Sequence, residues 1–185
     1  MSRTRPEHYD GLQILLHWGV ALLIAGVFSL ALIFDDMPLS PAKFGLISWH
    51  KWLGITVLAL AVLRLAWRGI RGAPAADTSL PAWQRGLATG VHHLLYLLMI
   101  ALPLAGWLMS SAKGYSVVLF GKIPLPDLVG KDEALGHLLK EAHELMAWTL
   151  LVLVALHAAA AIKHHVIDKD TTLARMLPFL RRKTS

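Results

Sequence analysis

Four long apolar stretches dominate this chain of 185 residues and limit what it can fold into. They cover residues 12–34, 44–67, 87–109 and 142–162. A helix needs about 20 apolar residues to cross the hydrocarbon core of a bilayer, and each stretch has that length. The composition agrees, because 56% of the residues are apolar and only 16% are charged. The sequence therefore predicts an all-α integral membrane protein, a four-helix transmembrane bundle formed by one domain over residues 1–185.

Lysine and arginine are divided unevenly between the two sides of the predicted spans. Every arginine lies at the N-terminus, around the loop between the second and third spans, or in the C-terminal tail. Loops that remain in the cytoplasm carry an excess of Lys and Arg, so both termini are predicted to be cytoplasmic in a multi-pass membrane protein. The net charge of +6 is then a topology signal and not a sign of nucleic-acid binding. No signal-peptide cleavage site follows the first stretch, which is expected to be retained.

Histidines inside the apolar stretches point to the function. The chain has no cysteine, which excludes iron–sulfur clusters, disulfides and covalently attached haem, but it has 10 histidines. An ionisable side chain inside a membrane is costly and needs a function or a partner there. His143 and His157 are 14 residues apart in the fourth span. Fourteen residues make almost four helical turns, so both imidazoles share one face, about 21 Å apart along the axis.

The depths of the histidines predict how they pair. The first span starts on the predicted inner side with His17 five residues in, and His157 lies five residues before the inner end of the fourth span. On the outer side, His50 lies six residues into the second span, and His143 stands at the start of the fourth. The predicted pairs are therefore His17 with His157 and His50 with His143.

Two histidines at each depth indicate haem more than any other metal group. A zinc or iron site built from side chains usually needs three or four protein ligands. Two opposed imidazoles suffice when a macrocycle supplies four further nitrogens, and such a haem passes electrons. His92 and His93 lie near the depth of His17, and one of them replacing His17 remains an alternative. A cofactor-free, histidine-lined transporter also remains open.

The fourth span carries its histidines on a single stripe. Its members are His143, Ala147, Leu150, Val154, His157, Ala161 and His164. Apart from the histidines they are small or aliphatic, as a flat macrocycle lying against a helix requires. Gly54, one turn after His50, leaves similar room, although small residues also serve helix packing in membranes.

Together these residues resemble the bacterial cytochrome b561 family over nearly the whole chain. The motifs that carry the resemblance are Leu16-His17-Trp18, His50 with Gly54, Tyr96-Leu97-Leu98 through Ala101-Leu102-Pro103, the His143–His157 spacing, Leu156 to Ala161 followed by His164-His165, and Asp170 to Met176. The resemblance implies a four-helix bundle with two haem b groups, held by the same pairs that the depths predict.

The resemblance also implies quinone as a redox partner. One type of member is a superoxide oxidase, which takes an electron from superoxide on the outer side and reduces ubiquinone. Other relatives are membrane subunits that link a dehydrogenase or hydrogenase to the quinone pool. We expect the first activity and keep the second as the alternative. Lys113, just after the third span, matches a basic position of the superoxide oxidases and is expected to attract the anion.

His164 lies two turns beyond His157 on the same stripe. Reduction of quinone consumes protons, and histidine is the side chain that exchanges protons near neutral pH. We therefore expect His164 to be catalytic in quinone reduction, with His165 as a second quinone-site residue. The outer segment of about thirty residues between the third and fourth spans is expected to fold over the outer end, with a short separate helix at about residues 132–140.

Overall fold

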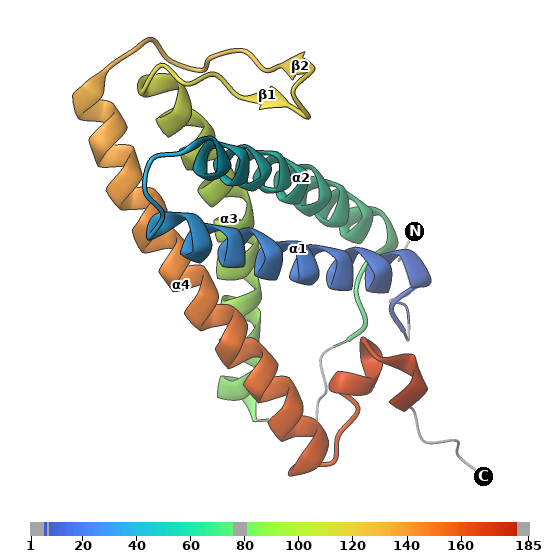
Figure 1. The fold of residues 1–185 in the computed structure, drawn as a ribbon. Helices are drawn as coiled ribbons and strands as arrows, with labels where there is room; N and C mark the ends of the chain where they lie inside the picture. The colour runs from blue at the N-terminus through green and yellow to red at the C-terminus, as the bar shows by residue number, and fades with distance from the viewer. Residues whose placement is uncertain (1–5, 7, 76–80, 181–185) are drawn as a thin grey trace.

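A computed structural model describes residues 6, 8–75 and 81–180. The described part contains four long helices (Figure 1): α1 (Gly11–Asp35), α2 (Pro41–Arg71), α3 (Ala82–Ala112) and α4 (Glu133–Val166). Each is long and apolar enough to cross a membrane, which confirms the predicted four-helix membrane protein. Five basic residues behind the orientation prediction, Arg3, Arg5, Arg181, Arg182 and Lys183, lie outside the described residues. The cytoplasmic location of both termini stays a prediction.

The helices pack in sequence order, α1 against α2, α2 against α3 and α3 against α4. A cluster of apolar side chains from all four helices forms the core: Val20, Val57, Ala61, Leu95, Leu98, Met99 and Leu150. Most other apolar side chains stay on the outside of the bundle, among them Leu22, Leu145 and Leu156. An apolar exterior around a small core is what a lipid environment requires of a helical bundle.

Polar residues fix where the helices begin and end. The Asp10 side chain accepts a hydrogen bond from the Gln13 backbone N–H at 2.9 Å, and Gln13 Oε1 accepts from the Asp10 N–H at 3.1 Å. This reciprocal pair is a capping box, which satisfies two donors at the start of α1. Gln13 Nε2 also donates to the Gly72 carbonyl at 2.9 Å and so ties this start to the end of α2. Gly72 has φ +77°, a left-handed conformation that glycine adopts without strain.

The two ends of the bundle differ. A two-stranded antiparallel hairpin, β1 (Val118–Leu119) and β2 (Ile123–Pro124), lies between α3 and α4 at what we call the hairpin end. The opposite end, which we call the tail end, carries the C-terminal segment with η1 (Leu173–Arg175) and η2 (Pro178–Leu180). Trp18 Nε1 donates to the Met176 carbonyl at 2.9 Å and holds this segment against α1.

One detail of the sequence prediction is wrong. No separate short helix lies at residues 132–140, because that stretch forms the first turns of α4. Asp132 caps the helix by accepting from the Leu135 N–H at 3.0 Å, and no proline interrupts the chain from there to Val166. α4 therefore extends well beyond the apolar stretch.

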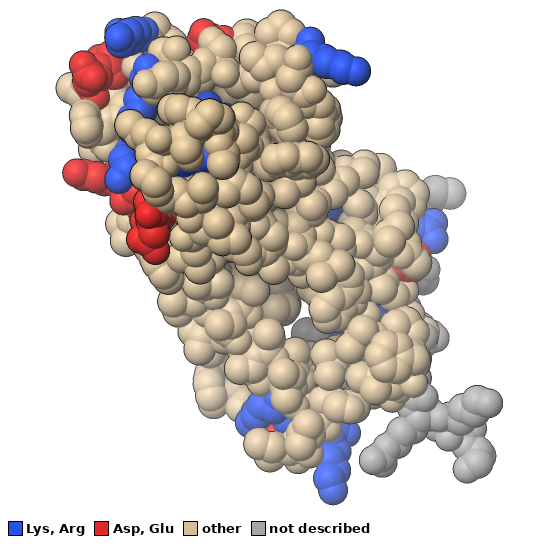
Figure 2. Space-filling model, viewed as in Figure 1, with Lys and Arg blue, Asp and Glu red and all other residues tan. Residues whose placement is uncertain are grey.

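Charged side chains gather at the two ends on the face shown in Figure 2. Between them runs a broad belt of uncharged surface, as expected where lipid tails surround the protein. The same view shows an opening between the lower part of α4 and the C-terminal segment.

Candidate haem sites

His50 of α2 and His143 of α4 face each other near the hairpin end. Their ring centroids are 6.2 Å apart, with 64° between the ring planes. His50 Nδ1 lies 3.0 Å from the Val27 carbonyl oxygen, and His143 Nδ1 lies 3.1 Å from that of Leu102. Because a carbonyl oxygen only accepts, each Nδ1 is the donor, and the Nε2 lone pair of each neutral ring is free. Such second hydrogen bonds are how proteins orient histidines that bind metals.

His17 of α1 and His157 of α4 repeat this arrangement toward the tail end. Their ring centroids are also 6.2 Å apart, and the angle between the rings is again 64°. The structure therefore brings together both of the pairs predicted from depth. It also places the His92 ring 5.3 Å from that of His157, and both His92 and His93 are exposed residues of α3.

The separation within each pair suits two imidazoles on opposite sides of one metal ion. A bond from an imidazole nitrogen to a first-row metal is about 2 Å long, and the ring centre lies roughly 1 Å further, so two opposed rings have centres about 6 Å apart. Both pairs match this value. No carboxylate belongs to either pair, so a metal held there takes its remaining ligands from elsewhere, as haem iron takes them from the porphyrin.

Glycines shape the surroundings of the hairpin-end pair. A Cβ atom added to Gly106 of α3 would stand 2.9 Å from His143 Cε1, so only glycine lets the ring occupy this position. A Cβ atom added to Gly54 would meet nothing within 4 Å, which means that open space lies beside this position of α2. The donor set and the open space thus fit haem b at the hairpin-end pair, and the ring separation is the same at the tail-end pair.

The predicted stripe of α4 turns toward the bundle. Each of its seven members is buried or half-buried, whereas Val152 and Ile162 between them are exposed. α4 therefore offers one histidine to each pair from the same face, as the spacing predicted.

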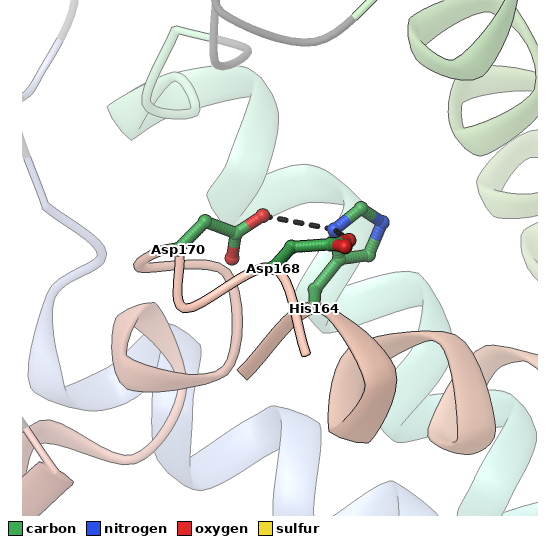
Figure 3. A group of neighbouring side chains, drawn as sticks. All are labelled: His164, Asp168 and Asp170. Atoms are coloured by element: carbon green, nitrogen blue, oxygen red, sulfur yellow. Dashed lines mark ion pairs between the residues drawn. The ribbon is translucent and has the colours of Figure 1, made fainter. Parts of the chain in front are cut away.

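His164, at the end of this stripe, forms a small cluster with two carboxylates (Figure 3). Its Nδ1 lies 2.9 Å from Asp168 Oδ2 and 2.9 Å from Asp170 Oδ2. The cluster is half-buried, because 18% of the His164 side chain and 12% of the Asp170 side chain are exposed. With Nδ1 turned to the carboxylates, Nε2 remains available to another group. His165 is half-buried beside it.

Lys113 caps the end of α3 at the hairpin end, and its side chain runs past Gly136 of α4. A Cβ atom on Gly136 would stand 2.9 Å from Lys113 Cγ. The passage of this lysine between α3 and α4 thus depends on a glycine, so the lysine is held in place and is not a freely moving surface charge.

Sequence reasoning missed several neighbours of the predicted ligands. Arg64 Nη2 lies 2.9 Å from His17 Nδ1. Lys51, the residue after the predicted ligand His50, has its Nζ 2.6 Å from Ser110 Oγ. Arg64 follows His50 by 14 residues, the same spacing as His143 to His157, which is a signal that places it on the histidine-bearing face of α2. Asp168 and Asp170 gave no such signal, because they lie beyond the helix, where periodicity no longer applies.

The comparison with known proteins agrees with this geometry. A family model described as prokaryotic cytochrome b561 matches residues 8–179. Cytochrome b561 homolog 2 of Escherichia coli K12 is 34% identical over 179 residues, covering 96% of this chain and 95% of that protein. Cytochrome b561 homolog 1 of the same organism is 34% identical over 178 residues, covering 96% and 99%. A protein of Yersinia pestis named probable superoxide oxidase CybB is 34% identical over 176 residues, covering 93% and 97%.

Proposed function

This chain belongs to the prokaryotic cytochrome b561 family, and on that premise we propose that it is a dihaem b oxidoreductase that carries electrons from superoxide to ubiquinone. Membrane electron transfer with b-type haem is the activity of the family, and the chain is a multi-pass protein of the bacterial inner membrane. The two haems, the superoxide donor and the ubiquinone acceptor are our proposal. The relative of Yersinia pestis named as a probable superoxide oxidase supports the donor.

The observation that carries the proposal is the repeated pair of histidines on α4. His50 with His143 and His17 with His157 have the same ring separation of 6.2 Å at two depths of one bundle. Each pair of histidines would hold one haem b, which would supply one-electron redox chemistry. Because each pair offers two protein ligands, a haem held there would serve electron transfer and not oxygen binding.

Electrons enter at the hairpin end in this proposal, where Lys113 attracts the superoxide anion. They leave at the tail end, which carries the arginines and is predicted to face the cytoplasm. His164 is placed there, seven residues or about 10 Å along α4 from His157. We propose that His164, with His165 beside it, binds the quinone and delivers protons, with Asp168 and Asp170 holding the His164 ring. Two superoxide ions, one ubiquinone and two protons then yield two dioxygen molecules and one ubiquinol.

Rapid mixing of the purified haem-loaded protein with superoxide tests the proposal. We expect the absorbance of reduced haem to appear after superoxide is added and to decay when a soluble ubiquinone analogue follows. Superoxide dismutase should abolish the first change. Protein that dithionite reduces but superoxide does not would contradict the proposal and favour the alternative, an electron-transfer subunit for a partner dehydrogenase or hydrogenase.

The role of His164 has a separate test. Replacement of His164 by Leu removes the proton donor and should slow the oxidation of reduced haem by quinone about tenfold or more, with both haem spectra unchanged. The exposed His137, also on α4, provides the matched control, and His137→Leu should leave the rate unchanged. Loss of haem from the His164 variant would refute this assignment.

A further inference from the structure

Arg64 is a cation inside the bundle for which the described residues supply no anion. It lies in α2, half-buried, with its guanidinium carbon 5.3 Å from the centre of the Tyr96 ring. None of the ion pairs between described residues includes Arg64. A cation at membrane depth is costly unless an anion or a set of acceptors surrounds it. The neutral ring of Tyr96 offsets part of this cost but does not balance the charge.

The contact of Arg64 with His17 is incompatible with iron binding by His17. Arginine can only donate hydrogen bonds, so His17 Nδ1, 2.9 Å from Arg64 Nη2, is the acceptor. A neutral imidazole that accepts at Nδ1 carries its proton on Nε2, which then has no lone pair for a metal. Binding through Nδ1 would displace the arginine directly. In both cases Arg64 must leave His17 before His17 can ligate iron.

The hairpin-end pair has no such conflict. His50 and His143 donate from Nδ1 to the backbone carbonyls of Val27 and Leu102, and these bonds persist when Nε2 binds a metal. The two predicted haem sites therefore differ in that an arginine contacts His17, a predicted ligand of the tail-end site. That arginine borders a small cavity lined by Tyr9, Gln13, Arg64, Arg68, Tyr96 and Met176.

We propose that Arg64 is the counter-ion of a propionate of the tail-end haem and moves from His17 to that carboxylate when haem binds. Haem b brings two carboxylates, an anion that no described residue supplies to Arg64, and a guanidinium binds a carboxylate through two parallel hydrogen bonds. This inference rests on the proposed pair of haems. A fixed positive charge beside a haem favours the reduced iron, which carries less positive charge, so Arg64 raises the midpoint potential of the tail-end haem above its value without the arginine.

Redox titration of the purified haem-loaded protein, followed by its absorbance, tests this role. In Arg64→Gln we expect both haems to remain, one midpoint potential to fall and the other to stay unchanged. Arg64→Lys retains the charge and should restore most of the potential. Arg68, whose guanidinium carbon is 6.0 Å from the same Tyr96 ring, does not touch His17, so Arg68→Gln should produce a smaller fall.

Each outcome of the titration distinguishes this inference from the proposed function. Two haems with unchanged potentials in Arg64→Gln, or an equal fall in Arg68→Gln, would overturn the role of Arg64 and leave the dihaem proposal standing. If Arg64→Gln binds only one haem, the inference requires Arg64→Lys to bind two, and a single haem in both variants overturns it. Wild-type protein with fewer than two haems would instead refute the proposed function itself.

Discussion

At the scale of single residues, the tail-end site offers three histidines for two axial positions. The His17 and His157 rings reproduce the geometry of the hairpin-end pair, while His92 lies closer to His157, at 5.3 Å. That spacing is shorter than the separation of about 6 Å expected for rings on opposite sides of one metal. We therefore predict that His17→Ala lowers the haem content from two to one per chain, whereas His92→Ala retains two. The content is measured as the pyridine haemochrome per mole of protein, and the reverse result would assign His92 as the ligand.

Gly106 gives a second prediction at this scale. The methyl group of Gly106→Ala would stand 2.9 Å from His143 Cε1 and displace the ring from its position opposite His50. We expect altered absorbance and a loss of about half of the bound haem, with the tail-end haem unaffected. Gly90 lies in the same helix with nothing near its added Cβ atom, so Gly90→Ala serves as the control. Equal spectra for both variants would show that Gly106 does not shape the site.

The pairing of the four histidines was predictable from sequence because depth and helical periodicity constrain them together. His17, His50, His143 and His157 lie on regular helices, where residue number converts directly into position. Their neighbours were harder to foresee. The contact of Arg64 with His17 depends on how α1 packs against α2, and the carboxylates near His164 depend on the path of the chain after the helix ends.

At the scale of helices, hydropathy located each span but not its ends. The predicted stretch 142–162 became α4 (Glu133–Val166), and 44–67 became α2 (Pro41–Arg71). Hydropathy falls where polar residues begin, but helical hydrogen bonding continues until a cap or glycine ends it. Ser40, which accepts from the Lys43 N–H, and Asp132 mark the true starts more accurately than the apolar pattern does.

The cap of α1 yields a prediction on pH. Burial acts to raise the pKa of the Asp10 carboxyl, but hydrogen bonds from the Gln13 N–H, Trp67 Nε1 and Arg71 outweigh it and hold the pKa below its ordinary value. The ionised carboxylate therefore stabilises the folded protein. This stabilisation is complete above the pKa of the unfolded chain and is lost as pH falls through the lower pKa of the folded state.

Thermal denaturation in detergent, followed by the loss of haem absorbance, measures this effect. Asp10→Asn keeps a capping side chain but not the charge, so its Tm should fall less than that of the wild type as the buffer is taken from pH 6 toward pH 3. Asp10→Ala removes the cap as well and should cost about 1 kcal/mol at neutral pH. Parallel pH profiles for the wild type and Asp10→Asn would contradict the role of the carboxylate.

At the scale of the whole molecule, the charged side chains visible in Figure 2 gather at the two ends, and the four proposed haem ligands lie between them. This arrangement follows from the bilayer, which excludes charge from the belt seen in Figure 2 and orders the histidines by depth. Composition was enough to predict such an arrangement. This arrangement does not specify the electron donor, because such an electron path can accept electrons from any one-electron donor.

The positive charge of Lys113 is proposed to attract the superoxide anion from a distance, through its electric field. If superoxide enters beside it, Lys113→Gln should lower the second-order rate constant of haem reduction by superoxide a few-fold and weaken its dependence on salt. Lys122, exposed on the turn of the β1–β2 hairpin, is the matched control and should change the rate little. Stopped-flow measurements at two ionic strengths give the rate constant for each variant. If both substitutions lower it equally, Lys113 does not mark the superoxide entry site.

The central claim is that four histidines at two depths hold two haems in one bundle. The amount of haem b per chain in the purified protein, with its oxidised and reduced spectra, tests that claim most directly. We expect two haems per chain, both with the low-spin spectra that two imidazole ligands would produce. Protein that binds no haem when it is available, or that saturates at one haem per chain, would contradict it.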